Sequence, residues 1–202
     1  MAEAETLSDL YDMMTTDLPG ITQPLMLQYL QRGAREFLRR SSTWQVQLDP
    51  HNLIASEDEY TLDWGPCAEI KTILEVRQNS AAGVTAGNKG GLIPSSGYEL
   101  TDTETLKFRS GFIPQASVTN GLDVKVVFVP DLRTCEIPKA LLNEWAEGIV
   151  GFAVWRLKMM KGKKWTDREG AGMHRFDFKN AINRGLSDNR YEKKNGMVSM
   201  TA

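Results

Sequence analysis

One group of residues has the types that metal-dependent phosphodiester chemistry needs. Asp63 is followed by Glu69 and Lys71. Nucleases of this kind hold magnesium between paired carboxylates and keep a lysine nearby. Alternating charges along a solvent-facing strand produce the same pattern, and a site must be justified by its chemistry rather than by a short match. A metal-dependent nuclease therefore stays the last of the alternative functions, and we expect no enzyme.

A glycine-rich segment, Gly83–Gly91, resembles a phosphate-binding loop only superficially. Lys89 is followed by Gly90 instead of the Ser or Thr that contacts magnesium, and the glycine spacing is one residue short. We interpret the segment as a hairpin loop whose glycines let it adapt to a partner surface. The residues expected to dock there are Val84, Thr85, Asn88 and Lys89.

Histidine and cysteine are too sparse to predict a catalytic or metal site. His51 is expected in the turn 49–52 and His174 on a polar helix face, and neither has a partner at metal-ligand spacing. No Ser-His-Asp or Cys-His arrangement can be argued. Cys67 and Cys135 are too few for a disulfide scaffold, and we interpret them as partly buried thiols whose proximity stays open. We expect no catalytic residue, no cofactor and no metal.

Composition excludes some function classes. The chain has 202 residues, 41% hydrophobic and 25% charged, with a net charge of −2. This is enough apolar material for a sizeable core. A charge near zero gives no global field toward nucleic acid or lipid. No apolar run is long enough to span a bilayer, so no membrane partner is expected.

The N-terminal zone, residues 5–43, has helical periodicity. Leu7, Leu10 and Met14 recur at three- and four-residue steps, which places them on one helix face. After a break at 17–20, Thr22 can cap a second helix that tolerates Pro24 in its first turn. That helix is expected to end at residues 41–42.

The middle zone, residues 44–135, changes to the two-residue period of strands. Strands are expected at 44–48, 60–64, 70–76, 98–100, 106–108 and 122–129, separated by local turns. Short strands joined in this way are typical of an antiparallel sandwich or small barrel. We therefore expect an inserted β module.

The C-terminal zone, residues 136–186, is again helical. One helix is expected over 138–161, with Trp145 in its core face, and Thr166 or Asp167 can cap a second helix to about Arg184. The side chains expected to pack from this second helix are Met173, Phe176, Phe178, Ala181 and Ile182. Residues 187–202 follow Gly185, are polar and basic, and are expected to form an extended tail. The prediction is thus an α+β fold, with a helical bundle from both ends of the chain.

Several polar and aromatic residues are candidates for a surface role. Trp155 lies off the apolar stripe, and Trp and Arg are favoured at interface hot spots. We expect a subunit interface at Arg35, Arg39, Trp155 and Arg156, although an intrachain contact of Trp155 stays open. The basic cluster 156–164 is interpreted as a solvated helix end. A DNA-binding module is the alternative that this cluster leaves open.

Motifs in both halves of the sequence resemble one protein family. The first half contains Leu18-Pro-Gly-Ile-Thr-Gln-Pro-Leu25, Ala34-Arg-Glu-Phe-Leu-Arg-Arg40 and Trp44. The second half contains Ile137-Pro138, Trp145, Gly148-Ile149, Gly151, Lys164-Trp-Thr-Asp167, Phe176 and Ala181-Ile182. In this order they are similar to the head-to-tail adaptor (connector) proteins of tailed bacteriophages. The chain departs from the family at Leu38, where Cys is frequent, and at Phe152, where Ala is frequent.

The resemblance implies a structural virion protein in the neck of the phage particle, assembled in the host cytoplasm. It implies a homo-oligomeric ring, commonly of twelve copies, attached to the portal protein after DNA packaging. The β module would face tail nozzle, tube or fibre proteins, and packaged DNA would pass through the lumen without sequence-specific binding. The C-terminal tail would bind the portal through Arg184, Asn189, Arg190, Tyr191, Lys193 and Lys194.

Overall fold

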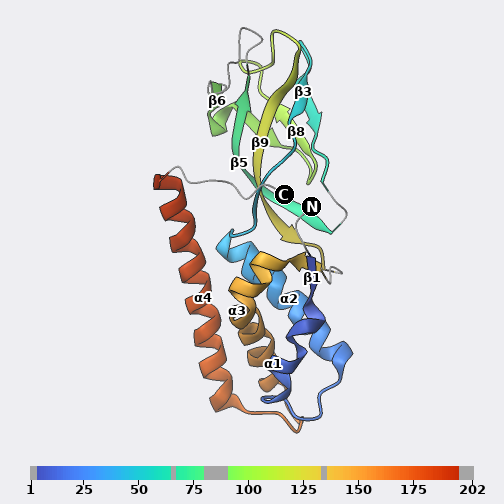
Figure 1. Cartoon of the computed structure of the whole chain (residues 1–202), viewed down its shortest axis with the longest axis vertical. Helices are drawn as coiled ribbons and strands as arrows, with labels where there is room; N and C mark the ends of the chain where they lie inside the picture. The colour runs from blue at the N-terminus through green and yellow to red at the C-terminus, as the bar shows by residue number, and fades with distance from the viewer. Residues whose placement is uncertain (1–3, 65–66, 80–90, 133–135, 196–202) are drawn as a thin grey trace. The chain divides into compact units, whose positions relative to one another are not determined.

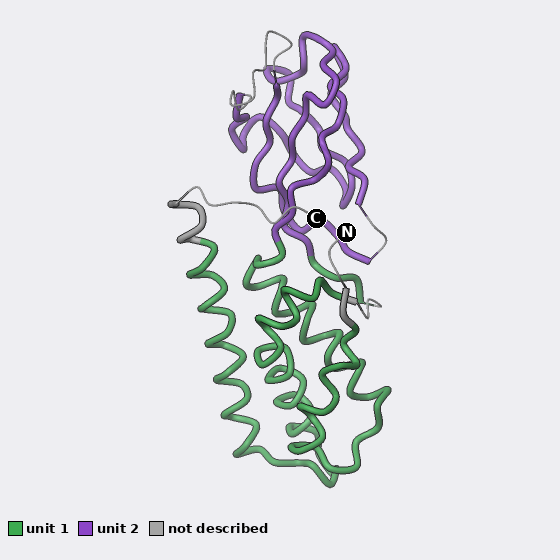
Figure 2. The backbone as a smooth tube through the Cα atoms, viewed as in Figure 1, with its two compact units in different colours: residues 1–44, 129–198 green, residues 45–128, 199–202 purple. Residues whose placement is uncertain are grey.

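The computed structural model describes residues 4–64, 67–79, 91–132 and 136–195. Its helices and antiparallel strands form an α+β protein, which confirms the predicted class. The chain divides into two compact units (Figure 2). A helical unit combines residues 1–44 with 129–198, and a β unit comprises residues 45–128.

The helical unit contains both ends of the described chain (Figure 1). Its elements are β1 (Ala4–Thr6), the 3-10 helix η1 (Leu7–Leu10), α1 (Tyr11–Thr15), α2 (Gln23–Ser41), β10 (Glu136–Pro138), α3 (Lys139–Lys158) and α4 (Arg168–Asn195). Strand β1 pairs with β10 in an antiparallel ladder. As predicted, α2 begins after Thr22 with a proline in its first turn, and it ends at Ser42 in the left-handed conformation, with φ 55°.

The core of the helical unit is built on aromatic side chains from three helices. Trp145 is 3% exposed, which confirms it as a core residue. Its ring centroid lies 5.2 Å from that of Phe37, and Phe178 lies 6.5 Å from Phe37. Gly148 allows α4 to approach α3, since a Cβ on this residue would lie 2.6 Å from Ala181 Cβ. Loss of this clearance would force the two helices apart.

Helix α4 corrects the prediction of an extended tail from residue 187. The helix continues to Asn195, and residues 196–202 lie outside the described part. Gly185 does not end the helix and is buried within α4. It permits close packing, since a Cβ at this position would lie 2.8 Å from Thr43 Cγ2. Met173 and Phe176, which were expected to pack, are 62% and 63% exposed on this helix.

The described strands of the β unit form open sheets. They therefore do not form the small barrel that was one of the two predicted architectures. β2 (Gln45–Gln47), β9 (Val118–Pro130), β5 (Ala68–Gln78) and β6 (Gly91–Ile93) are neighbours in one sheet, and β3 (His51–Leu53) also pairs with β9. β4 (Glu59–Thr61), β8 (Thr105–Phe108) and β7 (Tyr98–Leu100) form the other. A short 3-10 helix, η2 (Ser95–Gly97), precedes β7.

Alternating apolar residues fill the interior of the β unit, as the two-residue period predicts. Val46 is paired with Val126 across β2 and β9, and Tyr60 packs edge-on against Phe108 at 5.6 Å. His51 lies in β3 and not in a turn, because this strand, which was not predicted, includes the last two residues of the expected turn 49–52. Cys67 is exposed, contrary to the expected partly buried thiol, and Cys135 lies outside the described residues.

Candidate interface groove

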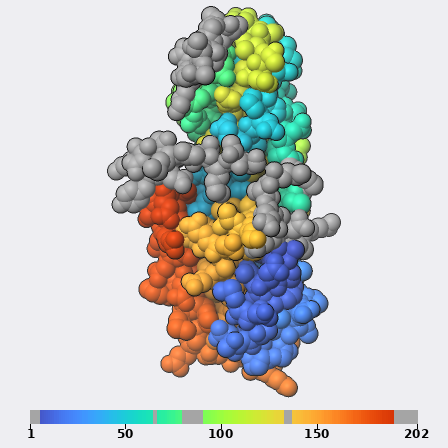
Figure 3. Space-filling view, viewed as in Figure 1, coloured from blue at the N-terminus to red at the C-terminus, as the bar shows by residue number. Residues whose placement is uncertain are grey.

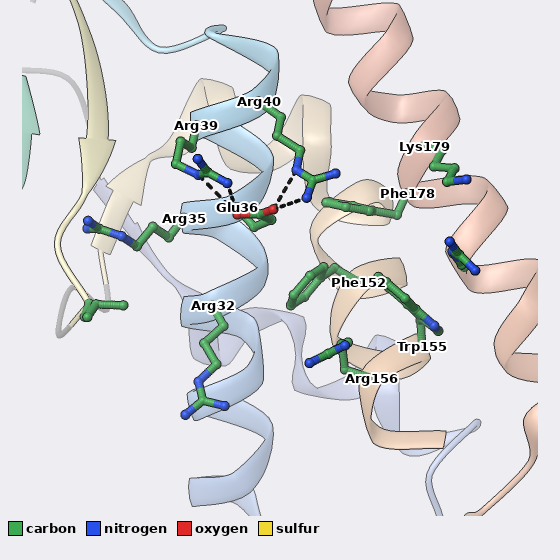
Figure 4. A pocket seen from close by; sticks show the side chains of 12 residues that line it. Arg32, Arg35, Glu36, Arg39, Arg40, Phe152, Trp155, Arg156, Phe178 and Lys179 are labelled. Atoms are coloured by element: carbon green, nitrogen blue, oxygen red, sulfur yellow. Dashed lines mark hydrogen bonds and ion pairs between the residues drawn. The ribbon is translucent and has the colours of Figure 1, made fainter. Parts of the chain in front are cut away.

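A groove of about 490 Å³ lies on the helical unit between α2, α3 and α4 (Figure 4). Its walls combine cationic and aromatic side chains, and we call it the arginine groove. The cations are Arg32, Arg35, Arg39, Arg40, Arg156, Arg175 and Lys179, and the aromatic residues are Phe152, Trp155 and Phe178. Glu36 is the acid among its lining residues, so the groove carries a large excess of positive charge.

Helix α2 provides one wall because it is amphipathic. Leu30, Ala34 and Phe37 are buried in the core, whereas the charged residues between them, Arg32, Arg35 and Glu36, are exposed or half-buried. Glu36 holds two of the arginines: its Oε2 lies 3.0 Å from Arg39 Nη2, and its Oε1 pairs with Arg40 (Figure 4). Both arginine side chains remain more than half exposed. The carboxylate therefore orders the wall while leaving its net charge positive.

The floor of the groove is aromatic. The rings of Phe152 and Phe178 meet at 5.1 Å, and Phe152 stands edge-on to Trp155 at 5.7 Å. Gly33 brings α2 close to this floor, because a Cβ there would lie 2.8 Å from the Ile149 carbonyl oxygen. Aromatic rings beneath a polar rim form the kind of centre that dominates binding energy at protein interfaces.

Two arginines meet at Trp155. The guanidinium carbon of Arg156 lies 5.5 Å from the centroid of the indole, and that of Arg175 lies 5.4 Å from it. Both distances are in the cation–π range. Among the residues described, no carboxylate pairs with either arginine, so each keeps its charge available to an external anion.

The structure brings the four predicted interface residues to this one groove: Arg35, Arg39, Trp155 and Arg156 all line it. Arg35 additionally donates to the Pro130 carbonyl oxygen at 2.7 Å, which fixes its side chain at the edge. Sequence reasoning missed the remaining lining residues. The three- and four-residue spacing of Arg32, Arg35 and Arg39 could have predicted that these arginines share one face of α2. No sequence pattern predicted the contact between Phe152 of α3 and Phe178 of α4.

The predicted portal-binding residues lie on α4. Arg184 sits 5.1 Å from the Trp145 ring centroid and 3.6 Å from Glu144 Oε1. Asn189 Nδ2 donates to the Ser41 carbonyl oxygen at 2.7 Å and so satisfies the end of α2. Both residues therefore make intrachain contacts and do not belong to a separate tail. The side chains of Arg190, Tyr191, Lys193 and Lys194 lie outside the described part, although the helix includes these positions.

The predicted docking loop, with Val84, Thr85, Asn88 and Lys89, lies outside the described residues. Asp63 is exposed and Glu69 is half-buried at the start of β5. Within the described ranges, no group of three or more His, Cys, Asp or Glu side chains is placed to hold a metal ion. The structure therefore adds nothing to the nuclease alternative.

A second polar cluster joins the ends of the helices. Lys158, expected in a solvated patch, is 7% exposed, and its Nζ lies 2.8 Å from Asp17 Oδ1 and 3.5 Å from Asp167 Oδ2. His174, which was expected on a polar helix face, lies with its Nε2 3.4 Å from Asp17 Oδ1, and its side chain is 13% exposed. Asp167 also caps α4 by accepting a hydrogen bond from the Gly170 amide at 2.9 Å.

These contacts shift two carboxyl groups. Burial works to raise the pKa of Asp17, but the hydrogen bond and charge of Lys158, with the charge of His174, outweigh it and lower the pKa. The pKa of Asp167 is lowered chiefly by the hydrogen bond from the Gly170 amide; burial opposes this shift, and Lys158 lowers the pKa further. Both groups are thus ionised in the folded protein, and their role is to hold the helix ends together.

No helix among the described residues is both long and apolar enough to cross a membrane. Comparison of the sequence with protein-family models and with curated proteins found no match.

Proposed function

We propose that this protein is a structural virion component, the head-to-tail adaptor that docks on the portal after DNA packaging and provides the platform for nozzle, tube or fibre proteins. The motifs from Leu18 to Ile182 support the family. The observation that carries the proposal is the arginine groove, where Arg35, Arg39, Trp155 and Arg156 lie together. A surface with an aromatic centre and an arginine rim is suited to a protein partner.

The proposed assembly is a ring of identical subunits, about twelve in number as the family implies. Such a ring requires two different patches on each subunit that meet head to tail. The arginine groove is proposed as one of them. DNA would pass through the lumen without base-specific contacts, in the neck of a particle assembled in the host cytoplasm.

Co-sedimentation with purified portal rings of the same virus tests the proposal. The chain is expected to sediment with the rings. A chain that stays in the supernatant at every protein concentration and salt would contradict the adaptor function. A β-unit surface variant, Lys107→Gln, is a suitable control, because Lys107 pairs with Glu59 at 2.6 Å, outside the helical unit.

DNA binding is the second candidate function, and the same groove favours it through its seven cations. Neutralisation of Z phosphates would make log K fall with log salt at a slope of about −0.9Z. A steep slope that Arg156→Gln flattens would support DNA binding. Weak binding that does not respond to salt would exclude it.

A further inference from the structure

The N-terminal part of the chain has the opposite charge to the arginine groove. From Met1 to Gln31 the sequence contains five acidic residues, Glu3, Glu5, Asp9, Asp12 and Asp17, and no Lys, Arg or His. The groove, in contrast, has six arginines and a lysine against one glutamate. One molecule thus carries two surfaces that attract each other between copies.

We propose that the arginine groove of one copy receives the exposed edge of η1 and α1 from a second copy, with Met13 on the aromatic floor and Asp9 and Asp12 against the arginines. We call Asp9, Asp12 and Met13 the acidic edge. The proposal rests on the proposed ring function and deepens it, since it names the two patches that meet.

The acidic edge has the composition that the groove requires. Asp12 and Met13 lie three and four residues after Asp9, so both are neighbours of Asp9 on the helical surface. Met13 is 42% exposed, whereas Leu10 and Met14 beside it are buried in the core. A flexible thioether next to two carboxylates matches an aromatic floor with a cationic rim.

The carboxylate of Asp12 is exposed and has no ion-pair partner among the described residues. Asp9 accepts a hydrogen bond from the Thr6 amide at 3.2 Å and keeps its negative charge. In Figure 3 the blue N-terminal residues lie at the surface of the helical unit. The edge is therefore available to another molecule.

A copy cannot fill its own groove with this edge. None of the groove's lining residues comes from η1 or α1, and α1 packs on α2 and α3. Two separate patches on one chain produce a head-to-tail contact, which closes into a ring when the rotation per subunit permits it. The exposed pair Met173 and Phe176 is a poorer occupant, because α4 also carries Arg168, Arg175, Lys179 and Arg184.

Two variants test the contact in sedimentation-velocity experiments. The edge variant is Asp12→Arg with Met13→Lys, and it leaves the capping residue Asp9 intact. The groove variant is Arg156→Gln with Arg175→Gln, which removes two of the groove's seven positive charges without adding an acid. At low salt we expect the wild-type chain to form concentration-dependent oligomers and each variant to associate at least about tenfold more weakly.

An equimolar mixture of the two variants is expected to form a heterodimer and nothing larger. The groove variant still carries an intact edge, and the edge variant still carries an intact groove, so one contact can form and both outer ends are blocked. Met159→Lys, at a methionine that is 47% exposed, is the matched control and should associate like wild type.

Three results would overturn the proposal. They are a wild-type chain that stays monomeric, a mixture that stays monomeric, and association abolished by Met173→Lys with Phe176→Lys but not by the edge variant. Portal co-sedimentation of the same variants separates this contact from the proposed function. A variant that binds the portal but does not self-associate would retain the adaptor function, whereas a wild-type chain that oligomerises but ignores the portal would contradict that function alone.

Discussion

Lys158 Nζ lies 2.8 Å from Asp17 Oδ1, although 141 residues separate them in the sequence. This ion pair connects the loop after α1 to the C-terminal end of α3, and Asp167 brings the start of α4 to the same ammonium. A lysine that is 7% exposed needs such partners, because a buried unpaired charge is costly. The cluster therefore stabilises the contact between the loop after α1, the C-terminal end of α3 and the start of α4.

Asp17→Asn should lower the free energy of unfolding by about 1–2 kcal/mol near neutral pH, because it removes the closest partner of Lys158. The figure is reduced for solvent screening at a carboxylate that is 35% exposed. Urea denaturation gives the difference. Equal midpoints for the variant and the wild type would show that Asp167 alone satisfies the lysine.

The same pair predicts a pH dependence. The folded-state pKa of Asp17 is lower than its ordinary value of 3.8. Its stabilising contribution is therefore complete above that value and is lost as the pH falls through the folded-state pKa. The stability difference between wild type and Asp17→Asn should shrink from about pH 5 toward about pH 2. A difference that stays constant over this range would contradict the ion pair.

Two glycine substitutions should have opposite signs. Gly148→Ala should destabilise the helical unit by about 1–3 kcal/mol, because the new Cβ would lie 2.6 Å from Ala181 Cβ. Gly172 is exposed within α4 and has no atom within 4 Å of the corresponding position, so Gly172→Ala should stabilise by about 0.5–1 kcal/mol. Thermal midpoints of both variants provide the comparison, and a stabilised Gly148→Ala would contradict the close packing of α3 on α4.

Trp145→Ala should lower the stability of the helical unit by about 3–5 kcal/mol, as for large aromatic truncations in a core. The ring is 3% exposed and packs on Phe37 at 5.2 Å. Trp155→Ala, at a half-buried ring in the groove, is the matched comparison and should cost clearly less. Similar losses for both tryptophans would mean that the groove floor is part of the core.

Deletion of residues 190–202 should leave the fold intact and abolish portal attachment. The cut keeps Asn189, whose side chain satisfies the Ser41 carbonyl oxygen at 2.7 Å, and removes the basic residues expected to bind the portal. Circular dichroism checks the fold and co-sedimentation checks attachment. Undiminished attachment would place the portal-binding residues elsewhere.

Local elements were predictable from the sequence, because periodicity and caps are local signals. Thr22 and Ser42 delimit α2 as expected, and the strand at 98–100 lies where alternation placed it. Gly185 was misinterpreted because a glycine that stops a helix and one that permits close packing look the same in a sequence. Only the approach of Thr43 distinguishes them.

The candidate site was predictable only in part. Arg35, Arg39, Trp155 and Arg156 were identified by type, since arginine and tryptophan off an apolar stripe need another explanation. These four residues line the same groove because of the way α2, α3 and α4 pack. That packing is set by contacts such as the one between Phe152 and Phe178, whose ring centroids lie 5.1 Å apart. Contacts between distant helices leave no periodic trace in the sequence. The burial of Lys158 was missed for the same reason.

Light scattering of the purified chain mixed with its portal ring is the most direct test of the adaptor function. The mass of the complex should increase by one chain per portal subunit and then saturate, as a closed ring on a symmetric platform requires. A portal mass that does not change at any ratio of the two proteins would contradict the proposed function.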